Sequence, residues 1–179
     1  VHSALTAKVT DVDTLWVGGK GGMEESLVKR QGIAFASVPA AGLHGVGLSA
    51  LPGNLLTLGR GVFAARRILK EFKPDVMFFT GGYVAAPVAI AGASIPILLY
   101  TPDIEPGLAL KSLARYADVI AVTKSQSQKF FKKKVRETGY PLRPDLSLWD
   151  RLTATRHLGI SGEKPVLLAF GGSKGARSI

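Results

Sequence analysis

Short apolar runs alternate with helical patterns along most of the chain. The apolar runs predict seven strands: Thr14–Val17, Ile33–Val38, Asp75–Thr80, Ile95–Tyr100, Asp118–Val122, Lys134–Thr138 and Pro165–Phe170. Most of these runs are continuous rather than alternating, which is typical of parallel strands covered on both faces.

Helical spacing of apolar residues fills the intervals between these runs. It predicts six helices: Gly22–Arg30, Leu55–Phe72, Pro87–Ala93, Leu108–Tyr116, Ser125–Phe131 and Leu146–Leu158. The longest is expected to bury one stripe, formed by Leu55, Leu58, Val62, Ala65, Leu69 and Phe72. Alternation of strands and helices predicts an α/β fold with a doubly wound, mostly parallel sheet of about six to seven strands and helices on both faces.

A Pro-flanked segment, Pro141–Asp145, predicts a stiff linker. We therefore expect a domain over residues 1–140, a linker region over residues 141–164 and the start of a second domain over residues 165–179, where Pro165–Phe170 would begin a separate sheet. Val1, Leu5 and Val9 have helical spacing without a preceding cap, and the last apolar run leads directly into a glycine turn. Both ends predict a piece of a longer protein.

Composition and charge narrow the possible chemistry. Apolar residues make up 46% of the 179 residues and charged residues 20%, which permits a packed core and excludes a disordered chain. Cysteine is absent, which excludes disulfides, thiolate catalysis and cysteine-ligated metals. The formal net charge of +10 suits anionic lipid or a diphosphate ligand. No nucleic-acid-binding motif and no metal-ligand spacing is present, so neither partner is expected.

Two glycine turns are candidate ligand sites. Thr80, Gly81, Gly82 and Tyr83 follow one apolar run, and a second turn containing Gly172 and Ser173 follows another. Each precedes a helical pattern, so backbone amides could approach a phosphate or a sugar hydroxyl closely. The alternative is a tight strand-to-helix turn packed on the sheet. Neither turn has the spacing of a P-loop or of a G-x-G-x-x-G fingerprint.

An apolar, glycine-rich stretch over residues 40–56 is unusual for a solvated connection. We expect a membrane contact here or, alternatively, a loop folded beneath its own domain. The residues expected at the contact are Leu43, Val46, Leu48, Leu51 and Leu55, with Arg60, Arg66 and Arg67 beside them. His44 lies in the same stretch and is a candidate ligand contact.

Arg143 lies between Pro141 and Pro144, directly after the last strand predicted for the first domain. A guanidinium on such a restricted backbone could bind a diphosphate through two parallel hydrogen bonds. The alternative is an ordinary surface arginine.

The motifs together resemble one enzyme family. They are Gly81-Gly82-Tyr83-Val84-x-x-Pro87, Gly139-x-Pro141-Leu142-Arg143 and Gly171-Gly172-Ser173-x-Gly175-Ala176-Arg177, supported by Gly22-Met23-Glu24 and Phe72-Lys73-Pro74-Asp75-Val76. In order and spacing they resemble the MurG family of bacterial UDP-N-acetylglucosamine transferases, over essentially the whole chain.

The resemblance implies a two-domain glycosyltransferase B fold, of which this chain would hold most of the Rossmann-like N-terminal, acceptor-side domain. It implies inverting transfer of GlcNAc from UDP-GlcNAc to undecaprenyl-pyrophosphoryl-MurNAc-pentapeptide in peptidoglycan synthesis, at the cytoplasmic face of the bacterial membrane and without a cofactor. The chain alone would be inactive. Donor-side contacts are expected from Asp103, Arg143, Gly172 and Ser173, and acceptor-side contacts from Thr80, Gly81, Gly82, Tyr83 and His44. No catalytic base is assigned.

One segment departs from the family pattern. Tyr100-Thr101-Pro102-Asp103 stands where the family usually reads His-Glu-Gln-Asn. Three alternatives stay open: a UDP-sugar transferase with another acceptor, a UDP-sugar epimerase of the same fold, and a non-catalytic α/β binding domain.

Overall fold

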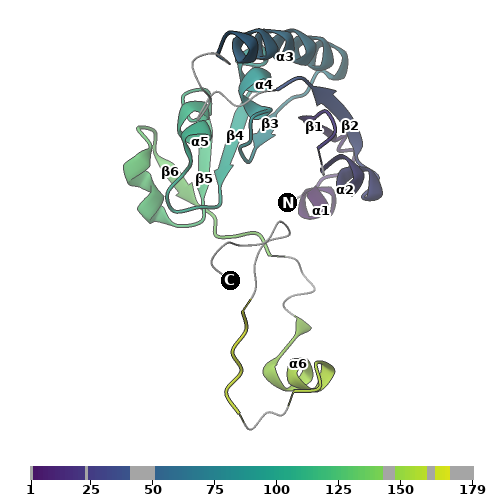
Figure 1. The fold of residues 1–179 in the computed structure, drawn as a ribbon, viewed down its shortest axis with the longest axis vertical. Helices are drawn as coiled ribbons and strands as arrows, with labels where there is room; N and C mark the ends of the chain where they lie inside the picture. Colours follow the sequence, from purple (N-terminus) through teal and green to yellow (C-terminus); the bar gives the residue numbers. More distant parts are fainter. Residues whose placement is uncertain (1, 23, 41–50, 143–147, 161–163, 170–179) are drawn as a thin grey trace. The chain divides into compact units, whose positions relative to one another are not determined.

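The computed structural model describes residues 2–22, 24–40, 51–142, 148–160 and 164–169. The chain divides into two compact units, Val1–Tyr140 and Pro141–Ile179. All the strands that the structure describes belong to the first unit, and one helix belongs to the second (Figure 1).

The six strands described are parallel and form two hydrogen-bonded sheets. In the smaller sheet β1 (Leu15–Gly19) pairs with β2 (Ala34–Val38). The larger sheet has the order β3-β4-β5-β6, with the bounds Met77–Phe79, Ile97–Thr101, Val119–Val122 and Val135–Glu137. The described residues therefore do not form the single sheet of six to seven strands that the sequence predicts. Apolar runs identify strands, but they do not specify which strands become neighbours.

Helices alternate with these strands and confirm the predicted α/β class. Their bounds are α1 (His2–Thr6), α2 (Glu24–Arg30), α3 (Leu51–Phe72), α4 (Ala85–Ala91), α5 (Leu108–Leu113) and the 3-10 helix η2 (Ser125–Phe130). Local chemistry explains α2: acidic residues occupy its first turn and basic residues its last, which complements the helix dipole. The Glu25 carboxylate also lies 2.7 Å from the Lys29 ammonium one turn later.

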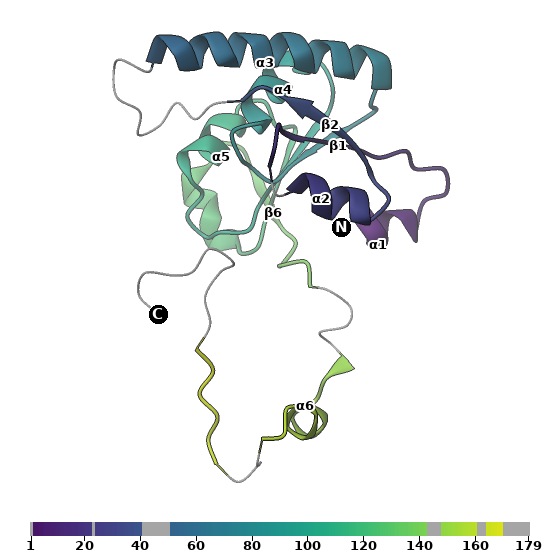
Figure 2. The ribbon, with the colours of Figure 1, turned by 45° about the vertical axis from the view of Figure 1, so that its right-hand side comes forward.

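The core lies between one face of the larger sheet and helices α3, α4 and α5 (Figure 2). Leu99 of β4 and Val122 of β5 are fully buried there. Small side chains on α4, such as Ala85 and Ala89, let α3 pack closely across it. Val38 of β2 joins the same cluster, so the two sheets share one core.

The other face of the larger sheet carries an apolar row. Phe78 of β3 is aligned with Leu98 of β4, which is aligned with Val119 of β5. Phe78 and Val119 are exposed, so the helical cover predicted for this face is not present among the described residues.

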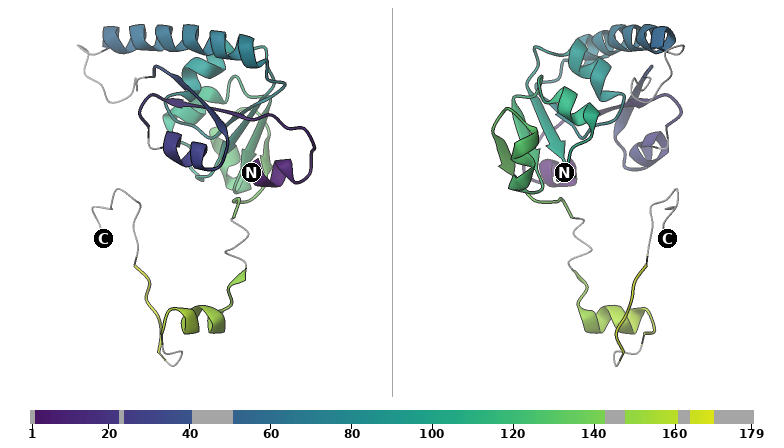
Figure 3. Two further views of the ribbon diagram at one scale, coloured as in Figure 1. Left: turned by 90° about the vertical axis from the view of Figure 1, so that its right-hand side faces the viewer. Right: turned by 60° about the vertical axis from the view of Figure 1, so that its left-hand side comes forward.

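The second unit contains α6 (Arg151–His157) (Figure 3). The Asp150 carboxylate accepts a hydrogen bond from the Thr153 amide at 2.7 Å, and the Thr153 hydroxyl accepts one from the Asp150 amide at 3.2 Å. This capping box fixes the first turn of the helix at Arg151, later than the predicted start at Leu146. The hydrogen bonds from Thr153 also lower the pKa of Asp150.

The predicted buried strand Pro165–Phe170 is not observed. Residues 165–169 form no strand, and the Leu167 side chain is 95% exposed. A strand needs a hydrogen-bonded neighbour, and none of the described segments pairs with this one. Phe170 and the following glycine turn lie outside the described residues.

Candidate functional site

The carboxyl ends of β3, β4, β5 and β6 lie along one edge of the larger sheet, because the four strands are parallel. Ligands of open α/β sheets bind at this edge, in the loops that follow the strands. Thr80 follows β3, and Pro102 and Asp103 follow the neighbouring β4. The structure thus brings the first glycine turn and Asp103 to adjacent strand ends.

The glycine turn after β3 has a backbone that other residues rarely adopt. Gly81 has a φ of 108° and Gly82 a φ of 88°. A Cβ atom on Gly81 would also lie 3.3 Å from the Leu110 side chain, whereas at Gly82 it would meet nothing within 4 Å. Gly81 is therefore a packing position, and the backbone of Gly82 is open to a ligand.

Side chains on either side of these glycines face solvent. Thr80 and Tyr83 are exposed. Val84, the N-cap residue of α4, makes no side-chain capping bond. The turn therefore combines exposed hydroxyl-bearing side chains with accessible backbone, which suits recognition of a polar, hydroxyl-rich ligand.

Hydroxyl groups link the loops after β4, β5 and β6. The Tyr100 hydroxyl lies 3.1 Å from the Thr123 hydroxyl and 3.2 Å from the Gly139 carbonyl, to which it can donate. The Thr123 hydroxyl donates to the Pro102 carbonyl at 2.8 Å. Asp103 is exposed, and its backbone carbonyl lies 3.5 Å from the hydroxyl of buried Thr101.

The loop after β5 has its own anchors. The Glu137 carboxylate accepts the Ser125 amide at 2.8 Å and the Lys124 ammonium at 3.4 Å. The Ser125 bonds and the Lys124 charge lower the pKa of Glu137. Buried Ser127 donates to the Ile104 carbonyl at 2.8 Å, which joins η2 to the segment that carries Asp103.

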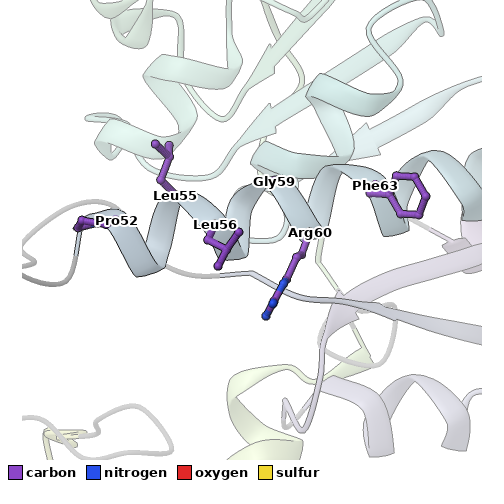
Figure 4. Close-up of a pocket in the computed structure, with 6 residues that line it drawn as sticks. All are labelled: Pro52, Leu55, Leu56, Gly59, Arg60 and Phe63. Carbon is purple, nitrogen blue, oxygen red and sulfur yellow. The ribbon is translucent and has the colours of Figure 1, made fainter.

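A separate apolar surface lies on the outer side of α3 (Figure 4). Leu55 is 61% exposed, Leu56 59% and Phe63 76%. With three further residues of the helix they line an open hollow, and we call these six residues the α3 outer face: Pro52, Leu55, Leu56, Gly59, Arg60 and Phe63. Arg66 and Arg67, about one turn later, are exposed as well.

This outer face corrects two expectations. Leu55 and Phe72 are exposed instead of completing the buried stripe of the long helix, while Ala65 and Leu69 pack inward. Residues 51–56 are helical and not part of a loop. The helix begins earlier than the pattern predicts, and its rotation is set by contact with α4.

Comparison with known proteins identifies the family. Residues 1–122 match the model described as the glycosyltransferase family 28 N-terminal domain. The chain belongs to this family. A relative from Desulforudis audaxviator is 43% identical over all of this chain and 49% of its own length, and one from Roseiflexus sp. is 38% identical over 92% of this chain and 43% of its own.

Both relatives are described as UDP-N-acetylglucosamine–N-acetylmuramyl-(pentapeptide) pyrophosphoryl-undecaprenol N-acetylglucosamine transferases. The chain spans about half the length of these curated relatives. The crystal structure of Acinetobacter baumannii MurG matches with a TM-score of 0.61 and 24% identity over 80% of this chain and 40% of that one, which supports the fold. The resemblance drawn from the sequence motifs is confirmed.

Several residues expected at the site of this family 28 chain lie outside the described residues. They are Leu43, His44, Val46, Leu48, Arg143, Gly172 and Ser173. Leu51 begins α3. Within the described ranges no helix combines the length and apolar content needed to cross a membrane, and no group of three potential metal ligands occurs.

Sequence reasoning misses two features of this family 28 chain that the structure shows. Exposed Phe63 is not among the residues predicted for the membrane contact. It lies seven residues after Leu56 and therefore on the same side of a helix, so helical spacing could have indicated it. The contact between Tyr100 and Thr123 joins residues 23 positions apart, and no local pattern could have indicated it.

Proposed function

We propose that the whole protein transfers GlcNAc from UDP-GlcNAc to undecaprenyl-pyrophosphoryl-MurNAc-pentapeptide. The observation that carries the proposal is the family 28 match over residues 1–122, together with relatives that are described as this transferase. The exposed glycine turn beside Asp103, at the ligand-binding edge of a parallel sheet, supports it.

The proposed reaction is a single displacement at the anomeric carbon of GlcNAc. The acceptor hydroxyl forms the new glycosidic bond and loses its proton, and the bond to the diphosphate of UDP breaks. Such a reaction needs both substrates in line, a group to accept the proton, and positive or dipolar groups near the diphosphate.

We assign the acceptor side to the turn of Thr80, Gly81, Gly82 and Tyr83. Its open backbone at Gly82 and its exposed side chains can contact a sugar or a phosphate. We place His44 near the same acceptor.

On the donor side we assign Asp103, Arg143, Gly172 and Ser173. A carboxylate accepts hydrogen bonds from sugar hydroxyls but repels a diphosphate, so Asp103 contacts a hydroxyl. The Arg143 guanidinium and the amides of the second glycine turn bind the diphosphate.

We further propose that the α3 outer face contacts the cytoplasmic surface of the cell membrane, where a lipid-linked acceptor presents its reacting sugar. Exposed Leu55, Leu56 and Phe63 can enter the lipid interface. The neighbouring basic residues attract anionic headgroups; they are Arg60, Arg66 and Arg67. Residues 43–48 would extend this contact.

The deciding experiment is a transfer assay on the full-length protein with UDP-GlcNAc and a lipid I analogue. Formation of the disaccharide product supports the proposal. Release of UDP only with a different acceptor would indicate a transferase of other specificity. Conversion of UDP-GlcNAc to its epimer without acceptor would indicate an epimerase, and binding without turnover a non-catalytic domain.

A further inference from the structure

The Tyr100 hydroxyl occupies a junction at the carboxyl edge of the larger sheet. Tyr100 is the fourth residue of β4, and its side chain is buried. Its hydroxyl reaches Thr123, directly after β5, at 3.1 Å, and the Gly139 carbonyl, two residues after β6, at 3.2 Å. Thr123 in turn donates to the Pro102 carbonyl at 2.8 Å. Two side chains thus connect the loops that follow three strands.

This junction contains fewer hydroxyl protons than oxygen–oxygen contacts. Tyr100 and Thr123 each have one hydroxyl proton, while the junction contains three oxygen–oxygen contacts. The contact between the Thr123 hydroxyl and the Pro102 carbonyl is the shortest of the three, so we place the Thr123 proton there. The Tyr100 proton then has two acceptors at nearly equal distance, the Thr123 oxygen and the Gly139 carbonyl.

The two carbonyls belong to segments with different roles. Pro102 immediately precedes Asp103, which we assign to the donor side. Gly139 has a φ of 76° and precedes Tyr140, the last residue of the first unit. The bond from Tyr100 therefore fixes the backbone one residue before the chain leaves this unit.

We propose that Tyr100 and Thr123 are positioning residues that fix the Asp103 loop and reversibly tether the start of the segment that leads into the second unit. When Gly139 moves away, the Tyr100 hydroxyl donates to Thr123 instead, so no hydroxyl of the junction loses its partner. Leaving a buried hydroxyl without a partner costs free energy and would oppose such a movement. Because Tyr100 has a second acceptor in Thr123, this cost does not arise here. The tether can open while the Asp103 loop stays in place.

Hydrogen–deuterium exchange on the full-length protein tests this inference. Tyr100→Phe keeps the ring and removes the hydroxyl, so exchange should rise about three- to tenfold at the Thr138 amide, which donates to the Val122 carbonyl at 2.9 Å, while strands β3 and β4 are unchanged. Thr123→Val removes the other hydroxyl, which holds the Pro102 carbonyl, and should raise exchange at Thr101, the last paired residue of β4. Thr123→Ser keeps a hydroxyl and should preserve the protection.

Tyr116→Phe is the matched control, because the contact of Tyr116 with the Arg115 guanidinium uses the face of its ring. It should leave exchange at Thr138 unchanged. Unchanged exchange in Tyr100→Phe, or an equal rise over all strands, would overturn the inference. If Tyr100→Phe does not fold, the comparison of Thr123→Val with Thr123→Ser decides alone.

The kinetic consequence rests on the proposed function. Thr123→Val should raise the KM for UDP-GlcNAc about three- to tenfold and change kcat less than about twofold, because it frees the Pro102 carbonyl and loosens the Asp103 loop, which binds the ground state and the transition state alike. A fall in kcat with unchanged KM would contradict a positioning role. If the wild-type protein transfers nothing, the proposed function fails, and the exchange experiment still tests the tether.

Discussion

Leu110 of α5 packs directly against Gly81 in the turn after β3. A Cβ atom at Gly81 would lie 3.3 Å from both Cγ and Cδ2 of Leu110. The contact couples the turn assigned to the acceptor side to the helix that follows the Asp103 loop, so the geometry of the turn depends on the packing of α5.

Gly81→Ala should destabilise the protein more than Gly82→Ala. Both residues have positive φ, which costs a residue with a side chain about 1–2 kcal/mol. Only at Gly81 would the added methyl group also meet the Leu110 side chain, so the thermal midpoint of Gly81→Ala should fall further than that of Gly82→Ala. Gly59→Ala, at an open helical position of α3, is the control and should stabilise by about 0.5–1 kcal/mol. Equal melting temperatures for the two turn variants would show that Leu110 adjusts freely.

Glu137 should contribute stability that depends on pH. Its hydrogen bonds from Ser125 lower its pKa in the folded protein below the ordinary value of 4.5, so the unfolded state binds more protons near that pH. The contribution is present above pH 4.5 and is lost as the pH falls through the folded pKa. Denaturant unfolding at decreasing pH should show a shallower loss of stability in Glu137→Gln than in the wild type. Parallel curves would contradict this role.

The α3 outer face should bind anionic vesicles. Leu56→Ser and Phe63→Ser should each weaken binding about five- to thirtyfold, which corresponds to about 1–2 kcal/mol for an apolar side chain removed from the interface. Co-sedimentation with vesicles containing anionic lipid measures this, and added salt should weaken binding further. Leu27→Ser, at an exposed apolar position of α2, is the control. If Leu56→Ser and Phe63→Ser bind the vesicles as tightly as the wild type and Leu27→Ser do, the α3 outer face is not the membrane contact.

Arg143→Lys should reduce kcat/KM for UDP-GlcNAc in the full-length protein by about 10- to 150-fold, the loss expected for a charge-assisted contact of about 1.5–3 kcal/mol. Lysine keeps the charge but cannot form two parallel hydrogen bonds with a diphosphate. Arg66→Lys, at an exposed position of α3, should leave donor use unchanged. Steady-state kinetics and thermal melting on the same variants measure both effects. A large drop in melting temperature would make Arg143 a structural residue.

The sequence by itself determined the order of elements, the parallel α/β class and the position of the glycine turn. A continuous apolar run such as Ile97–Leu99 is typical of a parallel strand, and this pattern is visible in the chain itself. Gly81 and Gly82 likewise mark a backbone conformation that few other residues adopt.

Tertiary structure decided which side of each element meets the core. Leu55 fits a buried stripe and an exposed contact equally well by spacing, and only the packing of α3 on α4 turns it outward. Pro165–Phe170 has the composition of a buried strand, yet strand formation requires a hydrogen-bonded neighbour that its own residues cannot supply. The Tyr100 hydroxyl finds Gly139, 39 residues away, because parallel strands bring their carboxyl ends together, and no local pattern encodes that distance.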